Sequence, residues 1–150
     1  SQAAGEYEER FAQKNLEVIL SNPEKEMYIS ADSRKLWRVF DNLLQNIYKY
    51  AHPDTRVFLS TNEKGEKVEI IFRNTSDEII SVSADELTER FTRGDESRHK
   101  EGNGLGLAIA KSMIDLQGGE FNISVDGDLF KVTLLLNKYA EPETKLSASP

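Results

Sequence analysis

Three glycines within five positions, followed directly by an apolar, helix-forming stretch, are the most concentrated chemical signal in the chain. They are Gly102, Gly104 and Gly106. Glycines at a helix start leave backbone N–H groups bare, and the helix dipole adds partial positive charge, so the stretch predicts a phosphate-binding site. The alternative is that the glycines only let a loop turn into a helix. Four cations that could reach a phosphate lie just upstream, at Arg90, Arg93, Arg98 and Lys100.

Two familiar glycine motifs are excluded by their spacing. A dinucleotide-binding fingerprint requires G-x-G-x-x-G directly after a strand, whereas this chain has G-x-G-x-G after the polar stretch 95–100. A Walker loop requires Gly-Lys-Ser or Gly-Lys-Thr, and neither tripeptide occurs in the sequence. The phosphate interpretation therefore rests on the physics of the glycines and of the helix that follows them.

A second candidate group lies on the long helix expected over Ser33 to Tyr50. Asn42, Asn46 and Lys49 stand at i, i+4 and i+7 and therefore share one face. An Asn carbonyl can ligand Mg²⁺, its amide can donate to a phosphate, and a lysine can meet a phosphate as a point charge. The alternative is an ordinary solvated face. The apolar stripe that should bury the helix is Leu36, Val39, Phe40, Leu43, Leu44 and Ile47.

Composition narrows the possible functions. The 150 residues suit one domain with a real core, and the net charge of −7 argues against nucleic acid as a partner. Cysteine is absent, which excludes disulfides and thiol chemistry, and the presence of only two histidines argues against a histidine-rich metal site. No apolar run approaches the roughly 18 residues of a membrane span, and no signal peptide is expected. Any metal should be a hard ion held by oxygens, such as magnesium.

The pattern of elements favours an α+β fold. The strands cluster as hairpins instead of alternating with every helix, which favours a mixed, mostly antiparallel sheet with helices on one face. The polar stretch 74–104 carries only a short helical piece near Asp85 to Arg90, and so long a connection is usually functional or mobile. Besides the long helix, the helices expected are Glu6 to Lys14 and Gly104 to Gln117, the latter with a Gly118-Gly119 cap. The expected strands are Leu16 to Leu20, Met27 to Ile29, Arg56 to Asn62, Glu66 to Arg73 (after a turn at 63–65), Glu120 to Val125 and Leu129 to Leu136.

Three segments, in order, resemble the catalytic and ATP-binding domain of sensor histidine kinases. "NLLQNIYKY" is similar to the N-box of that family, "ERFTRGDESR" to its F-box region, and "GNGLGLAIAK" followed by "LQGG" to its second glycine box. These kinases of two-component systems share an ATPase superfamily with DNA gyrase, the Hsp90 chaperones and the MutL proteins. The resemblance runs from about Leu16 to Leu136 and implies a two-layer α/β sandwich of the Bergerat type.

The resemblance also implies roles for individual residues. Asn46 would ligand the Mg²⁺ that bridges the ATP phosphates, with Asn42 as a nearby polar partner, and Lys49 would contact phosphate. Tyr50 would line the nucleotide pocket, and Phe91 would anchor a lid over about 75–104. Arg93 would reach the γ-phosphate, which makes Asn46, Lys49 and Arg93 the expected catalytic set. Backbone contacts to the nucleotide are expected along Gly102, Asn103, Gly104, Leu105, Gly106 and Leu107.

One motif departs from the family pattern. The first glycine box is normally D-x-G-x-G, whose Asp accepts from the adenine amino group, and here the segment 74–78 reads N-T-S-D-E. Asn74 can still accept through its oxygen, but it is neutral and also presents an N–H₂ group. Ser76 and Glu78 replace both glycines, so the backbone cannot approach the base as freely.

The resemblance leads to one functional expectation and one alternative. The first is a histidine kinase catalytic domain that positions the γ-phosphate of ATP for transfer to a histidine on a partner domain. That acceptor is not evident here, so the chain alone should not autophosphorylate. The alternative is a degenerate nucleotide-binding or docking module with weakened adenine recognition.

The resemblance also sets expectations for the surroundings of the domain. The expected partners are a histidine-bearing dimerisation domain and a response regulator, with the isolated domain monomeric. It would be a cytoplasmic domain of a membrane-anchored parent protein. The expected boundaries are an N-terminal helix or linker over 1–15, the ATPase domain over 16–138 and a flexible tail over 139–150.

Overall fold

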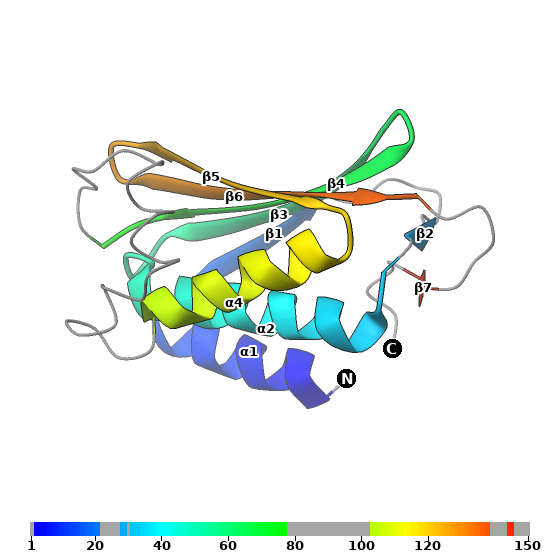
Figure 1. Cartoon of the computed structure of the whole chain (residues 1–150). Helices are drawn as coiled ribbons and strands as arrows, with labels where there is room; N and C mark the ends of the chain where they lie inside the picture. The colour runs from blue at the N-terminus through cyan, green and yellow to red at the C-terminus, as the bar shows by residue number, and fades with distance from the viewer. Residues whose placement is uncertain (1, 22–27, 30, 78–102, 139–143, 146–150) are drawn as a thin grey trace.

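The structure, a computed structural model, describes residues 2–21, 28–29, 31–77, 103–138 and 144–145. In this part of the chain a five-stranded sheet forms one layer, and three helices form a second layer on one of its faces (Figure 1). The expected α+β architecture with helices on one face is confirmed. The helices are α1 (Gln2–Gln13), α2 (Ser33–Tyr50) and α4 (Asn103–Leu116). The strands of the sheet are β1 (Glu17–Ser21), β3 (Arg56–Lys64), β4 (Lys67–Thr75), β5 (Glu120–Asp126) and β6 (Leu129–Asn137).

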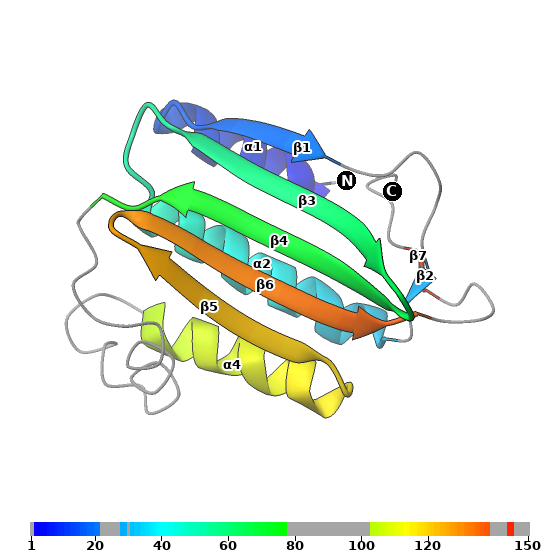
Figure 2. The ribbon, with the colours of Figure 1, turned by 90° about the horizontal axis from the view of Figure 1, so that it is seen from above.

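The sheet is mixed, with strand order β1-β3-β4-β6-β5. β1 and β3 pair in parallel, because α2 crosses over between them, and the other neighbours pair antiparallel. β4 and β6 are neighbours in the sheet although α4 and β5 separate them in the sequence. Seen from above the sheet, α2 lies beneath its middle, with α1 toward the β1 edge and α4 toward the β5 edge (Figure 2).

Local sequence accounts for the bounds of α2. The Asp32 carboxylate accepts from the amides of Arg34 (2.9 Å) and Lys35 (3.1 Å), which caps the first turn. The chain leaves the helix at Ala51, two residues before Pro53. The expected helix from Ser33 to Tyr50 is therefore confirmed. So is its apolar stripe, in which Leu36, Val39, Leu43 and Ile47 are buried and Phe40 and Leu44 are partly buried.

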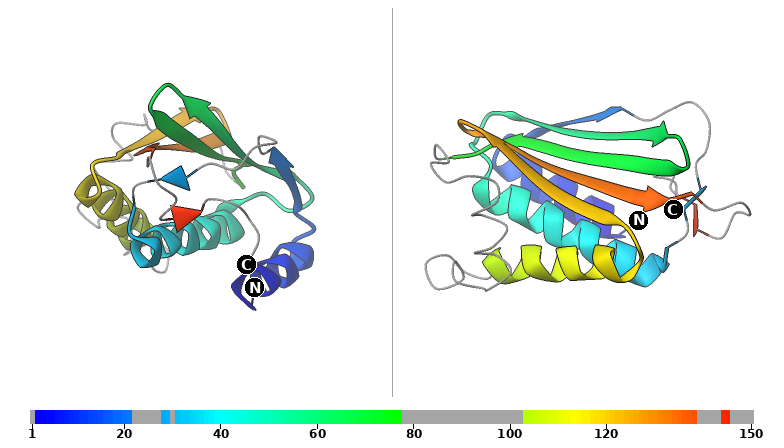
Figure 3. Two further views of the ribbon diagram at one scale, coloured as in Figure 1. Left: turned by 90° about the vertical axis from the view of Figure 1, so that its right-hand side faces the viewer. Right: turned by 45° about the horizontal axis from the view of Figure 1, so that its top comes forward.

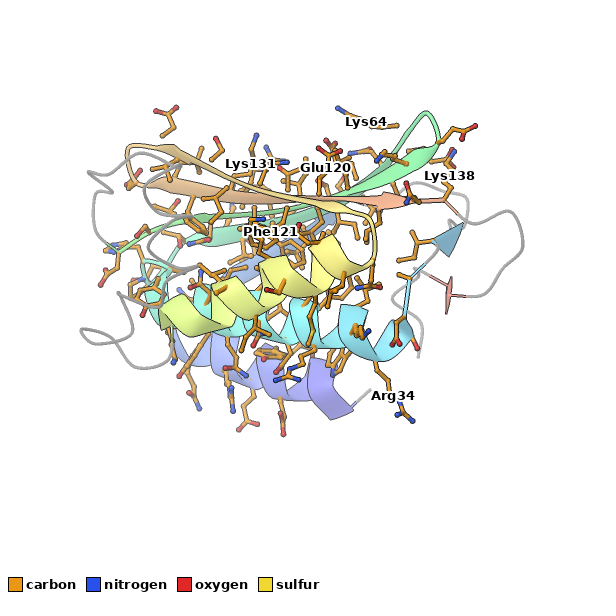
Figure 4. The ribbon with its side chains drawn as sticks, viewed as in Figure 1. Arg34, Lys64, Glu120, Phe121, Lys131 and Lys138 are labelled. Atoms are coloured by element: carbon orange, nitrogen blue, oxygen red, sulfur yellow. The ribbon has the colours of Figure 1, made fainter. Side chains whose placement is uncertain are left out.

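The end-on view shows the sheet and the helices as two facing layers (Figure 3). The hydrophobic core includes buried residues of both layers. Alternate residues of β4 and β6 point into it, and Phe121 of β5 lies between the sheet and α4 (Figure 4). α1 adds Tyr7 and Phe11, spaced i, i+4 and with rings 6.0 Å apart, to the same core. The opposite face of the sheet carries charged side chains that include Lys64 and Lys131 (Figure 4).

The α4–β5 connection depends on a close approach between backbones. Gly118 has φ +74°, which suits glycine, and the expected cap after α4 is confirmed by the bond from the Gly119 amide to the Ile114 carbonyl (3.0 Å). A Cβ on Gly119 would lie 2.6 Å from the Leu135 carbonyl oxygen of β6. The second glycine is therefore required by packing against the sheet.

Three details differ from expectation. The β3–β4 turn is Gly65-Glu66, not residues 63–65, because Lys64 still pairs with Lys67. α1 begins at Gln2, earlier than the expected Glu6. A two-stranded sheet between β2 (Tyr28–Ile29) and β7 (Thr144–Lys145) was not expected, because the tail gave no strand signal.

Several predictions lie outside the described residues. They concern the helical piece near Asp85 to Arg90 and the cations upstream of Gly102. Among the helices that the structure describes, none is long and apolar enough to cross a membrane.

Candidate functional site

Three elements meet at one end of the molecule. α2 and β4 both end there, and α4 begins there (Figures 1 and 2). α2 and α4 pack side by side and run in opposite directions, so the last turn of one lies at the same end as the first turn of the other. Most of the candidate residues that the structure describes therefore lie toward this end.

Main-chain bonds join the end of α2 to the end of β4. The Asp77 amide donates to the Tyr50 carbonyl (2.7 Å), and the His52 amide donates to the Thr75 carbonyl (2.8 Å). The His52 Nδ1 atom also lies 2.9 Å from the Asp77 carboxylate. Asn74, the residue before Thr75, is thereby held beside the end of the helix that carries the other candidates.

Asn42 is the most informative of these side chains. Its Nδ2 atom is buried and has no hydrogen-bond partner among the described residues. A buried donor without a partner costs on the order of 1–3 kcal/mol, so its presence calls for an explanation, and a bound water, ion or ligand would supply one. Asn46 follows one turn later on the same face and is partly exposed. The expected shared face of these two residues is consistent with the helix geometry of α2.

Lys49 and Tyr50 belong to the last turn of α2. Lys49 is exposed and Tyr50 is half-buried. A cation in the last turn also complements the negative end of the helix dipole. Lys49 thus adds a positive side chain, and Tyr50 an aromatic ring, to the helix that carries the two asparagines.

Asn74 lies on the inner face of β4 and is only 3% exposed. Its register partners are Val57 on β3 and Phe130 on β6, both buried. A carboxylate at so dry a position would pay a desolvation cost that the neutral amide avoids. The neutral amide at this position therefore suits the stability of the sheet, and it keeps an acceptor oxygen and a donor in place.

The segment that resembles the second glycine box forms the start of α4. Residues 103–106 form the first turn of α4, where backbone amides have no intrahelical acceptor. The side chain of Leu107 is 1% exposed and belongs to the hydrophobic core. Phe91, Arg93 and Gly102 lie outside the described residues.

Two residues of the α1 region, not singled out from the sequence, contact α2. The Tyr7 hydroxyl donates to the Asp41 carboxylate, and the Lys14 ammonium donates to the Tyr48 carbonyl (2.7 Å). Burial first, and then the bond to Asp41, raise the pKa of Tyr7 above its ordinary value. The sequence offers one signal for this contact, the i, i+4 spacing of Tyr7 and Phe11, which is typical of a packed helix face but identifies no partner.

The fold and the motifs at this end of the molecule belong to a known class of ATPases. Residues 31–139 match the family described as "Histidine kinase-, DNA gyrase B-, and HSP90-like ATPase", and the chain belongs to it. It is 36% identical over 118 residues to the probable sensor protein PcoS of Escherichia coli, covering 76% of this chain and 25% of that protein. It is 31% identical over 137 residues to the sensor histidine kinase WalK of Bacillus subtilis, covering 87% of this chain and 22% of that protein. The chain thus spans about a quarter of these relatives.

Solved structures agree on the fold. The catalytic domain of histidine kinase ThkA superposes with a TM-score of 0.77 at 20% identity, covering 91% of this chain and 88% of that one. Full-length ShkA in complex with AMPPNP gives 0.73 at 21% identity, covering 95% of this chain and 30% of that one. The resemblance to the ATPase domain of sensor histidine kinases is confirmed, and it is favoured over a degenerate docking module.

Proposed function

We propose that this domain binds Mg-ATP at the end of the molecule where α2 and β4 end and α4 begins. There it would present the γ-phosphate to a histidine on a separate dimerisation domain. In this reaction the domain would position the γ-phosphate and neutralise its charge, and it would carry out little covalent chemistry itself. The proposal is supported by the family, by relatives that are sensor kinases, and by one feature of the site itself.

That feature is the buried amide of Asn42. A donor with no partner among the described residues fits a ligand that brings acceptor oxygens, as the phosphates of a nucleotide do. The exposed ammonium of Lys49 lies two turns further along the same helix and suits the same anion. The bare amides in the first turn of α4 would add donors from the other side.

Magnesium would enter with the nucleotide. Within the described residues no three His, Cys, Asp or Glu side chains gather into a site that could hold a metal. Asn46 offers a carbonyl oxygen, a ligand that Mg²⁺ accepts alongside phosphate oxygens. The ion would neutralise charge on the phosphates, while Lys49 and Arg93 would bind their oxygens. Tyr50, Phe91 and Asn74 would contact the rest of the nucleotide.

The proposal extends to partners and cellular setting. The acceptor histidine would be on a dimerisation domain of the parent protein, and a response regulator would take the phosphate onward. The parent would be anchored in a membrane, with this domain on the cytoplasmic side and monomeric when isolated. The ATPase unit would span 16–138 and close with a lid over about 75–104.

Phosphate transfer in the full-length protein tests this proposal. Wild-type protein incubated with labelled Mg-ATP should gain acid-labile label on a histidine, and the Asn46→Asp variant should lose it. Asn122→Asp makes the same chemical change at an exposed position of β5 and should label as wild type does. The isolated domain should gain no label. Labelling of Asn46→Asp at the wild-type rate would refute the role given to this end of α2.

A further inference from the structure

In the last turn of α2, two carbonyl groups do not accept the usual helical hydrogen bond from the amide four residues further on. The Tyr48 carbonyl would ordinarily accept from the amide of His52, but that amide donates to the Thr75 carbonyl (2.8 Å). The Lys49 carbonyl would ordinarily accept from residue 53, which is Pro53 and has no N–H group. A helix end in this position needs a substitute donor from elsewhere in the fold.

Lys14 supplies that donor. Its Nζ atom lies 2.7 Å from the Tyr48 carbonyl oxygen and 3.5 Å from that of Lys49, and it sits 5.7 Å from the centre of the Tyr48 ring. An ammonium at this point also complements the negative end of the helix dipole. One side chain from outside the helix therefore closes its last turn.

Lys14 is itself held in place by the chain around it. α1 ends in a tight turn, in which the Leu16 amide donates to the Phe11 carbonyl (2.8 Å) and Asn15 adopts φ +53°. The Lys14 carbonyl accepts from the Asp54 amide (3.0 Å), and the Asn15 amide group donates to the Asp54 carboxylate (2.8 Å). The ammonium thus projects from a turn that is fastened to the loop after α2.

The turn that Lys14 closes carries the candidate nucleotide residues Lys49 and Tyr50. The Tyr50 carbonyl accepts from the Asp77 amide, so the same turn also fixes the start of the segment that follows β4. Burial lowers the pKa of Lys14, and attraction to the Asp77 carboxylate opposes that shift.

We propose that Lys14 is a positioning residue for the nucleotide site. Its ammonium sets the direction of the last turn of α2, and through it the placement of Lys49, Tyr50 and Asp77. This inference rests on the proposed function, because it assigns Lys14 to the binding of the same nucleotide. Lys14 would not contact the nucleotide itself and would act only through the end of α2.

Nucleotide titrations of three variants test the inference. Lys14→Met keeps the aliphatic stem and removes the donor, and it should raise the Kd for Mg-ADP about fivefold, the equivalent of one net hydrogen bond. Lys14→Arg restores a cationic donor and should bind within about twofold of wild type. Lys138→Met removes the same charge from the Lys138–Glu63 ion pair at the other end of the sheet (Figure 4) and should leave Kd unchanged.

A second control separates positioning from general loss of stability. Tyr7→Phe removes the Tyr7–Asp41 hydrogen bond of the same α1–α2 contact, two helical turns before Lys49. It should lower the unfolding temperature without changing Kd. An equal rise in Kd for Tyr7→Phe and Lys14→Met would overturn the proposal, as would wild-type affinity in Lys14→Met.

Hydrogen exchange in the nucleotide-free domain tests the same claim independently. In Lys14→Met the amides of Ala51 and Asp77 should exchange faster than in Lys138→Met, because the helix end is no longer closed. Unchanged exchange at both amides would overturn the positioning role. If wild-type domain failed to bind Mg-ADP, the proposed function would fall, while the exchange data would still show whether Lys14 holds this turn.

Discussion

The Asp77 amide donates to the Tyr50 carbonyl at 2.7 Å, and this bond joins the end of α2 to the end of β4. It links the helix that carries Asn42, Asn46 and Lys49 to the strand that carries Asn74. Residues more than 20 positions apart in the sequence are thereby held in one place. The candidate site follows from this junction and from the start of α4 beside it.

Replacing Asn42 with leucine should stabilise the nucleotide-free domain and weaken its binding of nucleotide. Leucine has a similar volume and removes the buried donor, which should raise the free energy of unfolding by about 1 kcal/mol. The same change should raise the Kd for Mg-ADP. Urea unfolding and calorimetry measure the two effects. A destabilised Asn42→Leu domain would mean that the amide has a partner without nucleotide.

Replacing Asn74 with aspartate should sharpen the preference for adenine. A carboxylate accepts more strongly from an amino group than a neutral amide does, and it cannot donate to the carbonyl of guanine. The ratio of the affinities for ADP and GDP should rise about fivefold. Burial of the carboxylate should also lower the unfolding temperature. An unchanged ratio, with Asn122→Asp as the exposed control, would exclude Asn74 from base recognition.

Replacing Gly119 with alanine should destabilise the domain by about 2 kcal/mol. The added Cβ would lie 2.6 Å from the Leu135 carbonyl oxygen, and neither backbone can move without disturbing the α4–β5 packing. Gly65→Asn is the matched control, because a new Cβ there meets nothing within 4 Å and asparagine tolerates positive φ. Denaturant unfolding compares the two, and equal stability of Gly119→Ala and wild type would contradict the described contact.

Tyr7 should make the stability of the domain fall at alkaline pH. Its pKa is raised in the folded state, first by burial and then by the bond to Asp41, so the folded chain keeps a proton that the unfolded chain loses above about pH 10. The folded state then binds more protons, and the free energy of unfolding decreases as the pH rises. Tyr7→Phe should show a shallower decrease between about pH 9 and pH 11. Equal slopes for the two proteins would contradict the raised pKa.

The elements that could be predicted from the sequence are those defined by local signals. α2 has a capping Asp32, an apolar residue every three or four positions and a stop at Pro53, so its bounds were predictable to the residue. The Gly118-Gly119 cap after α4 was equally local. A strand ending at Ile29 was expected from the sequence, but its pairing with β7 was not, since the two segments lie more than 100 positions apart and β7 has only two residues.

The candidate site likewise has one feature that the sequence predicts and two that it does not. The shared face of Asn42 and Asn46 follows from helical periodicity, which depends on spacing alone. The burial of the Asn42 amide depends on how α2 packs in the finished fold, and the bond from Lys14 to Tyr48 spans 34 positions. Neither the burial of the Asn42 amide nor the bond from Lys14 to Tyr48 leaves a pattern in the sequence, so both are known only from the structure.

Calorimetry of the isolated domain with Mg-ADP tests the central claim most directly. Wild-type domain should bind one nucleotide, and Asn46→Asp should bind at least about tenfold more weakly, because a carboxylate repels the phosphates and alters the magnesium ligand. Asn122→Asp should bind as wild type does. Absence of binding by the wild-type domain at millimolar nucleotide, or equal affinity in Asn46→Asp, would contradict a nucleotide site at the junction of α2, β4 and α4.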